Sequence, residues 1–339
     1  MDSLTQAVLG ASIAGAIAPH GHRRRALAAG ALLGTVPDLD VFIDFGGAVE
    51  NFTYHRGFSH SLFVLLPFSL VLWLALRHWW APVRESPMPW LAVIVLTLIT
   101  HPLLDAHTAY GTQLFWPMSV TPAMWATLFI IDPLFTLPLL IATVLAVVWS
   151  SRAWTGTVLV TAIGLSTFYL GWSWVAQGIV KSHARQSLAA AGLSDPPIFL
   201  TPTPFNTLLW RVVVLTEDGF LEGFDSLVVA EPGLRLHAHA SDVNALEAAS
   251  DIEAVARLRW FADDFVKAQV VDDKLLVSDL RMGQDPTYVF THVAAVRGNP
   301  HWQPTTTELL PVSFDDRALA ETWRRIWTEQ RIEETPEAK

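Results

Sequence analysis

Two pairs of ionisable residues stand at the edges of apolar segments early in the chain. Asp38 and Asp40 follow Pro37 directly after one apolar run, and His55 and His60 precede another. Carboxylates two residues apart in a loop can converge on a cation, and neutral imidazole is a common zinc ligand. The alternatives are a charged loop with helix caps for the aspartates and interfacial hydrogen bonding for the histidines.

A third candidate pair, His101 and Asp105, ends a further apolar run. Residues four apart share one face of a helix, so both side chains can reach the same ion, or the aspartate can orient the histidine. Pro102 between them leaves the helix geometry open. Asp132 is a fourth candidate, because a lone carboxylate in an apolar stretch needs a partner. It either binds metal or caps the helix that follows it.

Three neighbouring polar residues have different expected roles. Arg56 has a planar guanidinium that suits phosphate oxygens, so it is a candidate for stabilising a phosphoryl charge, with a lipid headgroup contact as the alternative. Ser59 is expected to cap the following helix. His107 lies off the face of His101, which favours hydrogen bonding over metal binding.

Apolar segments surround these groups and predict an α-helical integral membrane domain of about six transmembrane helices, since a span takes about 20 apolar residues. The N-terminal two segments are short and contain small residues such as Gly10 and Gly15, so they form either two closely packed spans or a re-entrant hairpin. The segments are 3–19, 26–37, 62–76, 86–104, 133–151 and 153–180.

Arginines predict the orientation of this domain. An alternating path through six helices places Arg23, Arg24, Arg25, Arg77, Arg84 and Arg152 on one face, which the positive-inside rule makes cytoplasmic. The candidate site and everything beyond residue 180 are then expected on the non-cytoplasmic side. No buried ionisable group is expected on the arginine side, which disfavours a transport pathway through the membrane.

Charge divides the 339 residues into a membrane domain, 1–180, and a small soluble α+β domain, 181–339. The chain has 22 Lys and Arg, 32 Asp and Glu, a net charge of −10 and no cysteine, and most of the charge follows residue 180. No basic stripe is present, so nucleic-acid binding is not expected. Any metal must be held by histidine and carboxylate ligands.

The soluble domain shows strand and helix patterns. Strands are expected at 208–216 and 274–280, turns at Asp218-Gly219 and Glu222-Gly223, and a stiff extended connector at 196–204. Helices are expected at 241–268, capped by Ser241 and Asp242, and at 315–332.

Four segments together resemble the YdjM-like membrane-bound metal-dependent hydrolases, which are described as LexA-regulated in some bacteria. They are Met1 to Gly10, the Pro-Asp-Leu-Asp at 37–40, the His-Arg-Gly-Phe-Ser-His-Ser at 55–61, and the His-Pro-Leu-Leu-Asp at 101–105 running to Trp116-Pro117. The resemblance covers roughly the first 140 residues. It implies a bacterial inner-membrane protein and, through a more distant similarity to zinc-dependent phospholipase C, hydrolysis of a phosphoester or lipid-like bond. Many relatives have a histidine where this chain has Gln6.

The expected function is therefore metal-assisted hydrolysis, in which a divalent ion, zinc or alternatively manganese, activates water. The expected metal ligands are Asp38, Asp40, His55, His60, His101, Asp105 and Asp132, and the expected catalytic residues are Asp38, Asp40 and Arg56. One carboxylate of this set would remain free to serve as general base. Two alternatives remain: a membrane protein that handles ions or solutes, and a noncatalytic scaffold stabilised by metal. The sequence does not indicate an oligomeric state.

Overall fold

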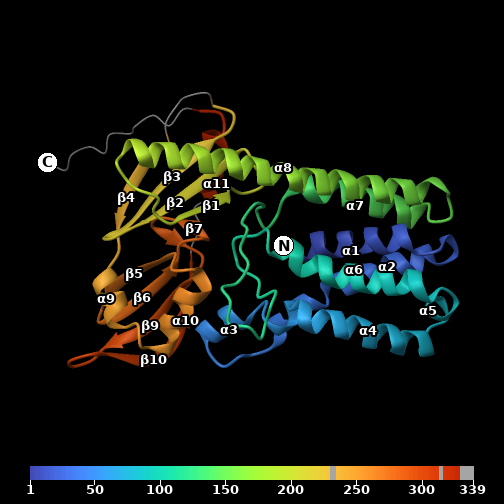
Figure 1. The fold of residues 1–339 in the computed structure, drawn as a ribbon, viewed down its shortest axis with the longest axis horizontal. Helices are drawn as coiled ribbons and strands as arrows, with labels where there is room; N and C mark the ends of the chain where they lie inside the picture. The colour runs from blue at the N-terminus through green and yellow to red at the C-terminus, as the bar shows by residue number, and fades with distance from the viewer. Residues whose placement is uncertain (230–233, 313–315, 329–339) are drawn as a thin grey trace.

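The computed structural model describes residues 1–229, 234–312 and 316–328, which form two halves (Figure 1). Long helices run side by side in one half, and sheets with short helices form the other. Helix α8 runs along both halves, and the N-terminus lies near the boundary between them. We call these parts the helical half and the sheet half.

Every apolar segment expected from the sequence forms a helix in the helical half. Helix α8 continues beyond the expected end at residue 180 to Ala190, so it crosses the expected domain boundary. The long helices are α1 (Ser3–Ile17), α2 (Arg23–Thr35), α4 (Leu62–Trp79), α6 (Pro87–Asp105), α7 (Pro133–Val148) and α8 (Trp154–Ala190). The short elements between them are η1 (His20–His22), η2 (Pro37–Phe42), α3 (Ala48–Tyr54), η3 (Phe58–His60) and α5 (Ala81–Glu85).

Among the helices of the described ranges, three are long and apolar enough to cross a membrane, by length and composition: α4, α6 and α8. Helices α1 and α7 are apolar but shorter, and α2 begins with three arginines. The expected number of six spans is therefore not confirmed. Large apolar side chains of α4, such as Phe68 and Val71, are exposed, as in a helix that faces lipid.

Helices α1 and α2 form a close hairpin because glycines face each other where they cross. A Cβ atom on Gly30 would lie 2.2 Å from the carbonyl oxygen of Gly10, so only glycine lets the two backbones approach this far. This contact fixes the end of α2, from which Asp38 and Asp40 follow in η2.

The arginine-rich connections meet at one end of the helical half, opposite the sheets. The side chain of His22 bonds to Glu85 in α5, and Arg23 donates to the backbone oxygens of Ser150 and Arg152 between α7 and α8. Arg23 is buried, contrary to the expectation that this side carries no buried ionisable group. Its partners are carbonyl oxygens, so its role there is to bind helix ends together.

The sheet half contains two four-stranded antiparallel sheets with the orders β1-β2-β3-β4 and β10-β9-β6-β5, and a two-stranded ribbon, β7-β8. Its strands are β1 (Ile198–Pro202), β2 (Leu209–Thr216), β3 (Gly219–Ser226), β4 (Leu236–Ala240), β5 (Val266–Val271), β6 (Lys274–Asp279), β7 (Gly283–Gln284), β8 (Thr287–Tyr288), β9 (Thr291–Arg297) and β10 (Trp302–Leu309). Its helices are α9 (Val243–Ala248), α10 (Glu253–Ala262) and α11 (Asp316–Arg325).

Two elements of the helical half pack into the cores of the sheet half. The last part of α8 packs against the first sheet, where Val180 and Leu188 belong to the same buried apolar cluster as Trp210 and Val212. Helix α3 packs against the second sheet and α10, with Phe52 between Phe261 and Phe290 at ring-centroid distances of 4.9 and 4.4 Å. These shared cores hold the two halves in a fixed relation.

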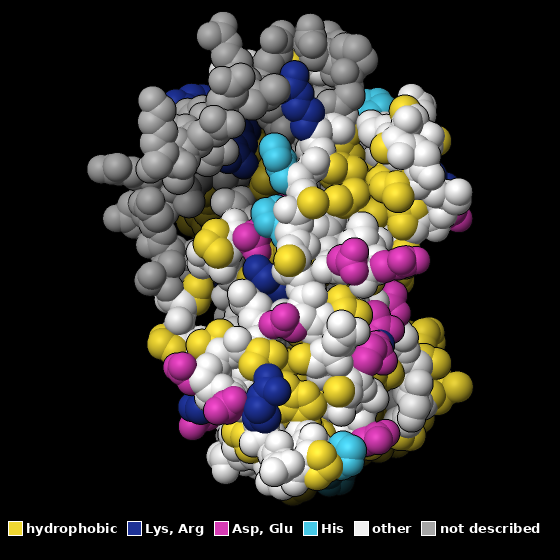
Figure 2. All heavy atoms as spheres, turned by 90° about the vertical axis from the view of Figure 1, so that its left-hand side faces the viewer, with side chains coloured by type: hydrophobic (Ala, Val, Ile, Leu, Met, Phe, Trp, Pro, Cys, Tyr) yellow, Lys and Arg dark blue, Asp and Glu magenta, His cyan; other side chains and the backbone are white. Residues whose placement is uncertain are grey.

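Figure 2 looks onto the end of the sheet half that points away from the helices. Acidic, basic and histidine side chains are scattered over this end between apolar ones. Such a mixed charged surface suits water, in contrast to the apolar exposed face of α4.

Several expectations for the sheet half need correction. Glu222-Gly223 is not a turn but lies inside β3, and the expected connector at 196–204 includes the edge strand β1. The expected helix at 241–268 is two helices, α9 and α10, followed by β5. Of the expected helix at 315–332, the structure has Asp316–Arg325, and residues 315 and 329–332 lie outside the described ranges.

The caps expected for that helix also have other partners. The hydroxyl of Ser241 accepts from the amide of Ala268, and the carboxylate of Asp242 accepts from the amide of Val270. Both side chains therefore bond to strand β5 and not to the first turn of α9.

Candidate metal centre

Four ionisable side chains meet where the helical half approaches the sheet half. Asp38 lies in η2 after α2, His60 ends η3 before α4, and His101 and Asp105 lie one turn apart at the end of α6. Ligand atoms of all four lie within 4.8 Å of one another, and they form a group suited to a metal ion. We call this group the metal centre. Three of its side chains are fully buried, and that of Asp38 is 20% exposed.

The atoms that face one another are two imidazole nitrogens and two carboxylate oxygens. The Nε2 atoms of His60 and His101 are 3.1 Å apart. Oδ1 of Asp38 lies 3.5 and 3.3 Å from these two nitrogens, and Oδ2 of Asp105 lies 3.1 and 3.4 Å from them.

Hydrogen bonds on the far side of each ring fix where its proton lies. Nδ1 of His101 is 2.6 Å from the carbonyl oxygen of Gly34, which only accepts, so Nδ1 donates. Nδ1 of His60 is 2.9 Å from the Ser59 hydroxyl, which donates its own proton to Asp40 and therefore accepts from His60. In the neutral rings both Nε2 atoms then carry lone pairs.

Two lone pairs and two carboxylates facing one another at these distances need a positive charge between them, and a divalent cation meets that need. Histidine ligands usually donate their second N–H to a carbonyl or a hydrogen-bonded acceptor, as both do here. The donor set therefore fits a metal ion, and two nitrogens with two oxygens are typical of zinc and related divalent ions.

Asp40 lies beside the metal centre and orients one of its residues, His60, through hydrogen bonds by way of Ser59. Its carboxylate accepts hydrogen bonds from the Ser59 hydroxyl, the backbone amide of Arg56 and Nδ1 of His55, the last at 2.8 Å. Burial raises the pKa of Asp40, but the bond and charge of His55, with His60 and Ser59, outweigh it and hold the pKa below its usual value. An ionised Asp40 holds Ser59 in the orientation that orients His60.

Asp105 uses its two oxygens for different purposes. Oδ1 accepts from the Gln6 side chain at 3.0 Å and contacts the Met1 amine. Oδ2 faces the two histidines and lies 3.4 Å from Nε of Arg56. The second oxygen is thereby left pointing at the metal centre.

Arg56 is held against this centre in an unusual backbone conformation. It is buried, has a φ of 60°, donates from Nη1 to the Thr108 hydroxyl at 3.2 Å, and stacks over Tyr110 at 5.0 Å. These contacts place a permanent positive charge beside Asp105.

The candidates from the sequence therefore divide into two sets. Asp38, His60, His101 and Asp105 are brought together, while Asp40 and His55 lie beside them and bond to each other. Asp132 is not part of the group. Its carboxylate caps α7 through the amides of Leu134 and Phe135 and accepts from the Tyr169 hydroxyl at 2.9 Å.

The structure also tests the roles expected for His107 and Ser59. His107 bonds through Nδ1 to the carbonyl oxygen of Leu103 and packs against Trp125, outside the metal centre. The helix cap of α4 is Ser61 and not Ser59, since the Ser61 hydroxyl accepts from the amide of Phe63.

Sequence reasoning missed the contributions of Gln6, Met1 and Gly34. Gln6 was singled out only as the position where relatives carry histidine, and it lies at the centre as a donor to Asp105. Gly34 gave no signal, because a backbone carbonyl that orients a histidine can belong to any residue type.

The fold and the site define a helical membrane protein with a buried His-Asp centre at one end of its helices. Residues 1–180, just over half of the chain, match the YdjM inner membrane protein family. The chain belongs to this family, as the resemblance in its sequence predicts.

Two relatives extend the comparison. "Uncharacterized protein YfhP" of Bacillus subtilis (strain 168) is 24% identical over 288 residues, which cover 78% of this chain and 83% of that protein. "Inner membrane protein YbcI" of Escherichia coli (strain K12) is 34% identical over 93 residues, 27% of this chain and 52% of that protein. No solved structure matches the chain.

Proposed function

We propose that this protein is a membrane-bound, metal-dependent hydrolase of a phosphoester or lipid-like bond. The observation that carries the proposal is the meeting of two imidazole nitrogens and two carboxylate oxygens from three separate segments, with the Nδ1 atom of each imidazole hydrogen-bonded on the far side of its ring. Family membership supports a location in the inner membrane of bacteria.

Asp38, His60, His101 and Asp105 would hold one divalent ion, zinc or alternatively manganese. When bound, such an ion supplies Lewis-acid chemistry: it lowers the pKa of water and polarises the bond to be cleaved. His101, held by Gly34, and His60, held by Ser59 and Asp40, are oriented for this before any ligand arrives.

Three residues have further roles in the proposal. Asp38 is the most exposed member of the group, so it is the carboxylate that a substrate or water meets and the one suited to take a proton. Asp40 orients Ser59, and its three bonds make it a positioning residue instead of a base. Arg56 provides a positive charge for a developing phosphoryl oxyanion.

A noncatalytic scaffold stabilised by metal is the second candidate, and one observation favours it. His60, His101 and Asp105 have no exposed side-chain surface, as in closed structural sites. The two functions differ in the coordination of the ion. A catalytic ion keeps one coordination position open for water or substrate, whereas a structural ion has all its positions filled by protein ligands.

The test is a hydrolysis screen on the purified full-length protein, with phosphoester and lipid substrates, beside Asp38→Asn. We expect metal-dependent turnover in the wild type, abolished by a chelator and restored by zinc or manganese. Asp38→Asn keeps a side-chain oxygen at this position, so the variant should still bind metal supplied in excess, although with lower affinity. Its turnover should fall by about 10²–10⁴-fold, the usual contribution of a positioned acid or base. Metal binding without turnover of any substrate would favour the scaffold.

We also propose that the helical half is a multi-pass membrane domain and that the metal centre and the sheet half face away from the cytoplasm. Support comes from Arg23, Arg152 and the α5 segment, which meet at the opposite end of the helices. A reporter fused after residue 339 should be active only outside the cytoplasm. Activity of a reporter that works only in the cytoplasm would contradict this orientation.

A further inference from the structure

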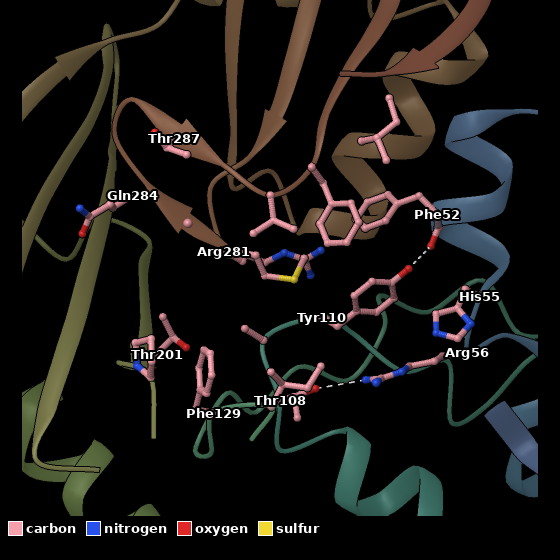
Figure 3. A pocket seen from close by; sticks show the side chains of 18 of the residues that line it. Phe52, His55, Arg56, Thr108, Tyr110, Phe129, Thr201, Arg281, Gln284 and Thr287 are labelled. Carbon is pink, nitrogen blue, oxygen red and sulfur yellow. Dashed lines mark hydrogen bonds between the residues drawn. The ribbon is translucent and has the colours of Figure 1, made fainter. Parts of the chain in front are cut away.

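A cavity of 1320 Å³ lies between the helical half and the sheet half (Figure 3). It is larger than the roughly 300–1,000 Å³ of most small-molecule sites. Its walls come from both halves, since they include Phe52 of α3 and Phe129 as well as Thr201, Arg281 and Thr287. The sheet half is therefore needed to complete the cavity.

Much of the wall is apolar. Phe52, Tyr110 and Phe290 form an aromatic cluster with centroid distances of 4.4 to 5.8 Å, and Val289 and Leu309 continue this wall in the sheet half. Burying a ligand against such side chains releases about 25 cal/mol for each Å² of apolar surface. The wall thus favours a long apolar group over a small polar solute.

Polar side chains line the cavity in both halves: Arg211, Arg281 and Gln284 in the sheet half, and a second group that adjoins the metal centre. Asp40, His55, Arg56 and Thr108 line the cavity, and Arg56 also contacts Asp105. The four clustered residues do not line the cavity themselves, but Arg56, which does, lies 3.4 Å from Asp105. A ligand with one polar end would place that end here.

The outer edge of the cavity is apolar and open. Val41, Phe42, Ile43 and Ile130 line the cavity and are also exposed, Phe42 to 84%. These residues follow α2 and precede α7, at the ends of the helices in the helical half. This is the level at which the proposed bilayer ends, where exposed large apolar side chains contact lipid.

We infer that this cavity binds the alkyl chain of a bilayer lipid, which enters sideways past Phe42 and Ile130 and places its polar end against His55 and Arg56. A water-soluble ligand would gain nothing from the apolar edge, whereas a chain already in the bilayer stays in apolar surroundings along this path. If the bound lipid is taken to be the substrate, the inference rests on the proposed function. Binding of the alkyl chain itself can be measured without turnover.

The probe is phosphatidylglycerol with a diazirine in one palmitoyl chain, placed in lipid nanodiscs with the full-length protein. After irradiation and digestion, mass spectrometry should find label on the peptide with Val289 and Phe290, which lie in the sheet half, as well as on exposed α4. Label on α4 reports ordinary bilayer contact and serves as the internal reference.

Phe42→Arg should lower the label at Val289 and Phe290 about tenfold relative to α4, because a guanidinium on the apolar path disfavours the chain by at least the 1.4 kcal/mol that this factor represents. Phe42→Leu should retain it. The matched control is Val271→Arg, an exposed valine in β5 that does not line the cavity, which should leave the label unchanged.

Label confined to α4 and other lipid-facing helices would overturn the inference, and so would equal labelling of the sheet half in Phe42→Arg and the wild type. Labelling of Val289 and Phe290 without turnover of any lipid would support the inference while refuting the proposed hydrolysis. The failure of one is thereby distinguishable from the failure of the other.

Discussion

Replacing His60 with alanine is expected to remove the metal site. The variant loses one of two nitrogen ligands and leaves Asp38, His101 and Asp105 without the atom that faces all three. Loss of a partner that merely orients a ligand costs about 10–100-fold in affinity, so loss of the ligand itself should cost more. Isothermal titration with zinc measures this directly.

The same variant should lose the stabilisation that the ion provides. A ligand at 1,000 times its dissociation constant stabilises the folded state by about 4 kcal/mol, so zinc should raise the melting temperature of the wild type but not of His60→Ala. His183→Ala is the matched control, because His183 is exposed and pairs with Asp225 outside the centre. Equal zinc affinity in His60→Ala and the wild type would refute the assignment.

Gly30→Ala is expected to have the second-largest effect. Its Cβ would lie 2.2 Å from the carbonyl oxygen of Gly10 and 2.5 Å from Cβ of Ala14, so α1 and α2 must move apart. Overpacking of this kind typically costs about 1–3 kcal/mol. The shift also reaches the centre, because α1 carries Gln6 and α2 carries Gly34, which bond to Asp105 and His101.

Gly164→Ala in α8 is the control for this change, since no atom lies within 4 Å of the added Cβ. Alanine there should be neutral or stabilise the helix by up to about 1 kcal/mol. Thermal unfolding and zinc titration of both variants give the comparison. A Gly30→Ala protein with unchanged melting temperature and zinc affinity would show that the close crossing does not hold the centre.

The positions of the long helices were predictable from the sequence, because most of the apolar runs are bounded by charged residues or proline. The predicted segments 62–76 and 86–104, which the structure has as the helices Leu62–Trp79 and Pro87–Asp105, were recognised by composition alone, which a bilayer selects strongly. The number of transmembrane spans was not predictable in this way, since α1 and α7 are apolar but short.

The sheet half was harder to predict because its elements are short and depend on distant partners. Residues 241–268 have helical periodicity throughout, but Val266–Val271 pairs with Lys274–Asp279 and becomes a strand. The prolines near residue 200 suggest a connector, yet Ile198–Pro202 pairs with β2 as an edge strand, where proline is tolerated.

For the candidate site, residue types and spacing identified His60, His101 and Asp105, which lie together in the structure. Residue types and spacing did not show which of Asp38 and Asp40 belongs to the metal centre, because this depends on which carboxylate bonds to His55 and Ser59 instead. Nor could they assign Asp132, whose partner Tyr169 lies on the next helix. The cavity could not be predicted from the sequence, since its lining residues come from segments as far apart in the chain as Asp40 and Thr322.

X-ray absorption spectroscopy of the zinc-loaded full-length protein tests the central claim most directly. One tightly bound ion per chain is expected, with a first shell of nitrogen and oxygen atoms at about 2.0–2.2 Å and the outer-shell scattering of two imidazole rings. Those rings would belong to His60 and His101. Failure to retain any zinc, or a bound ion without imidazole scattering, would contradict the account.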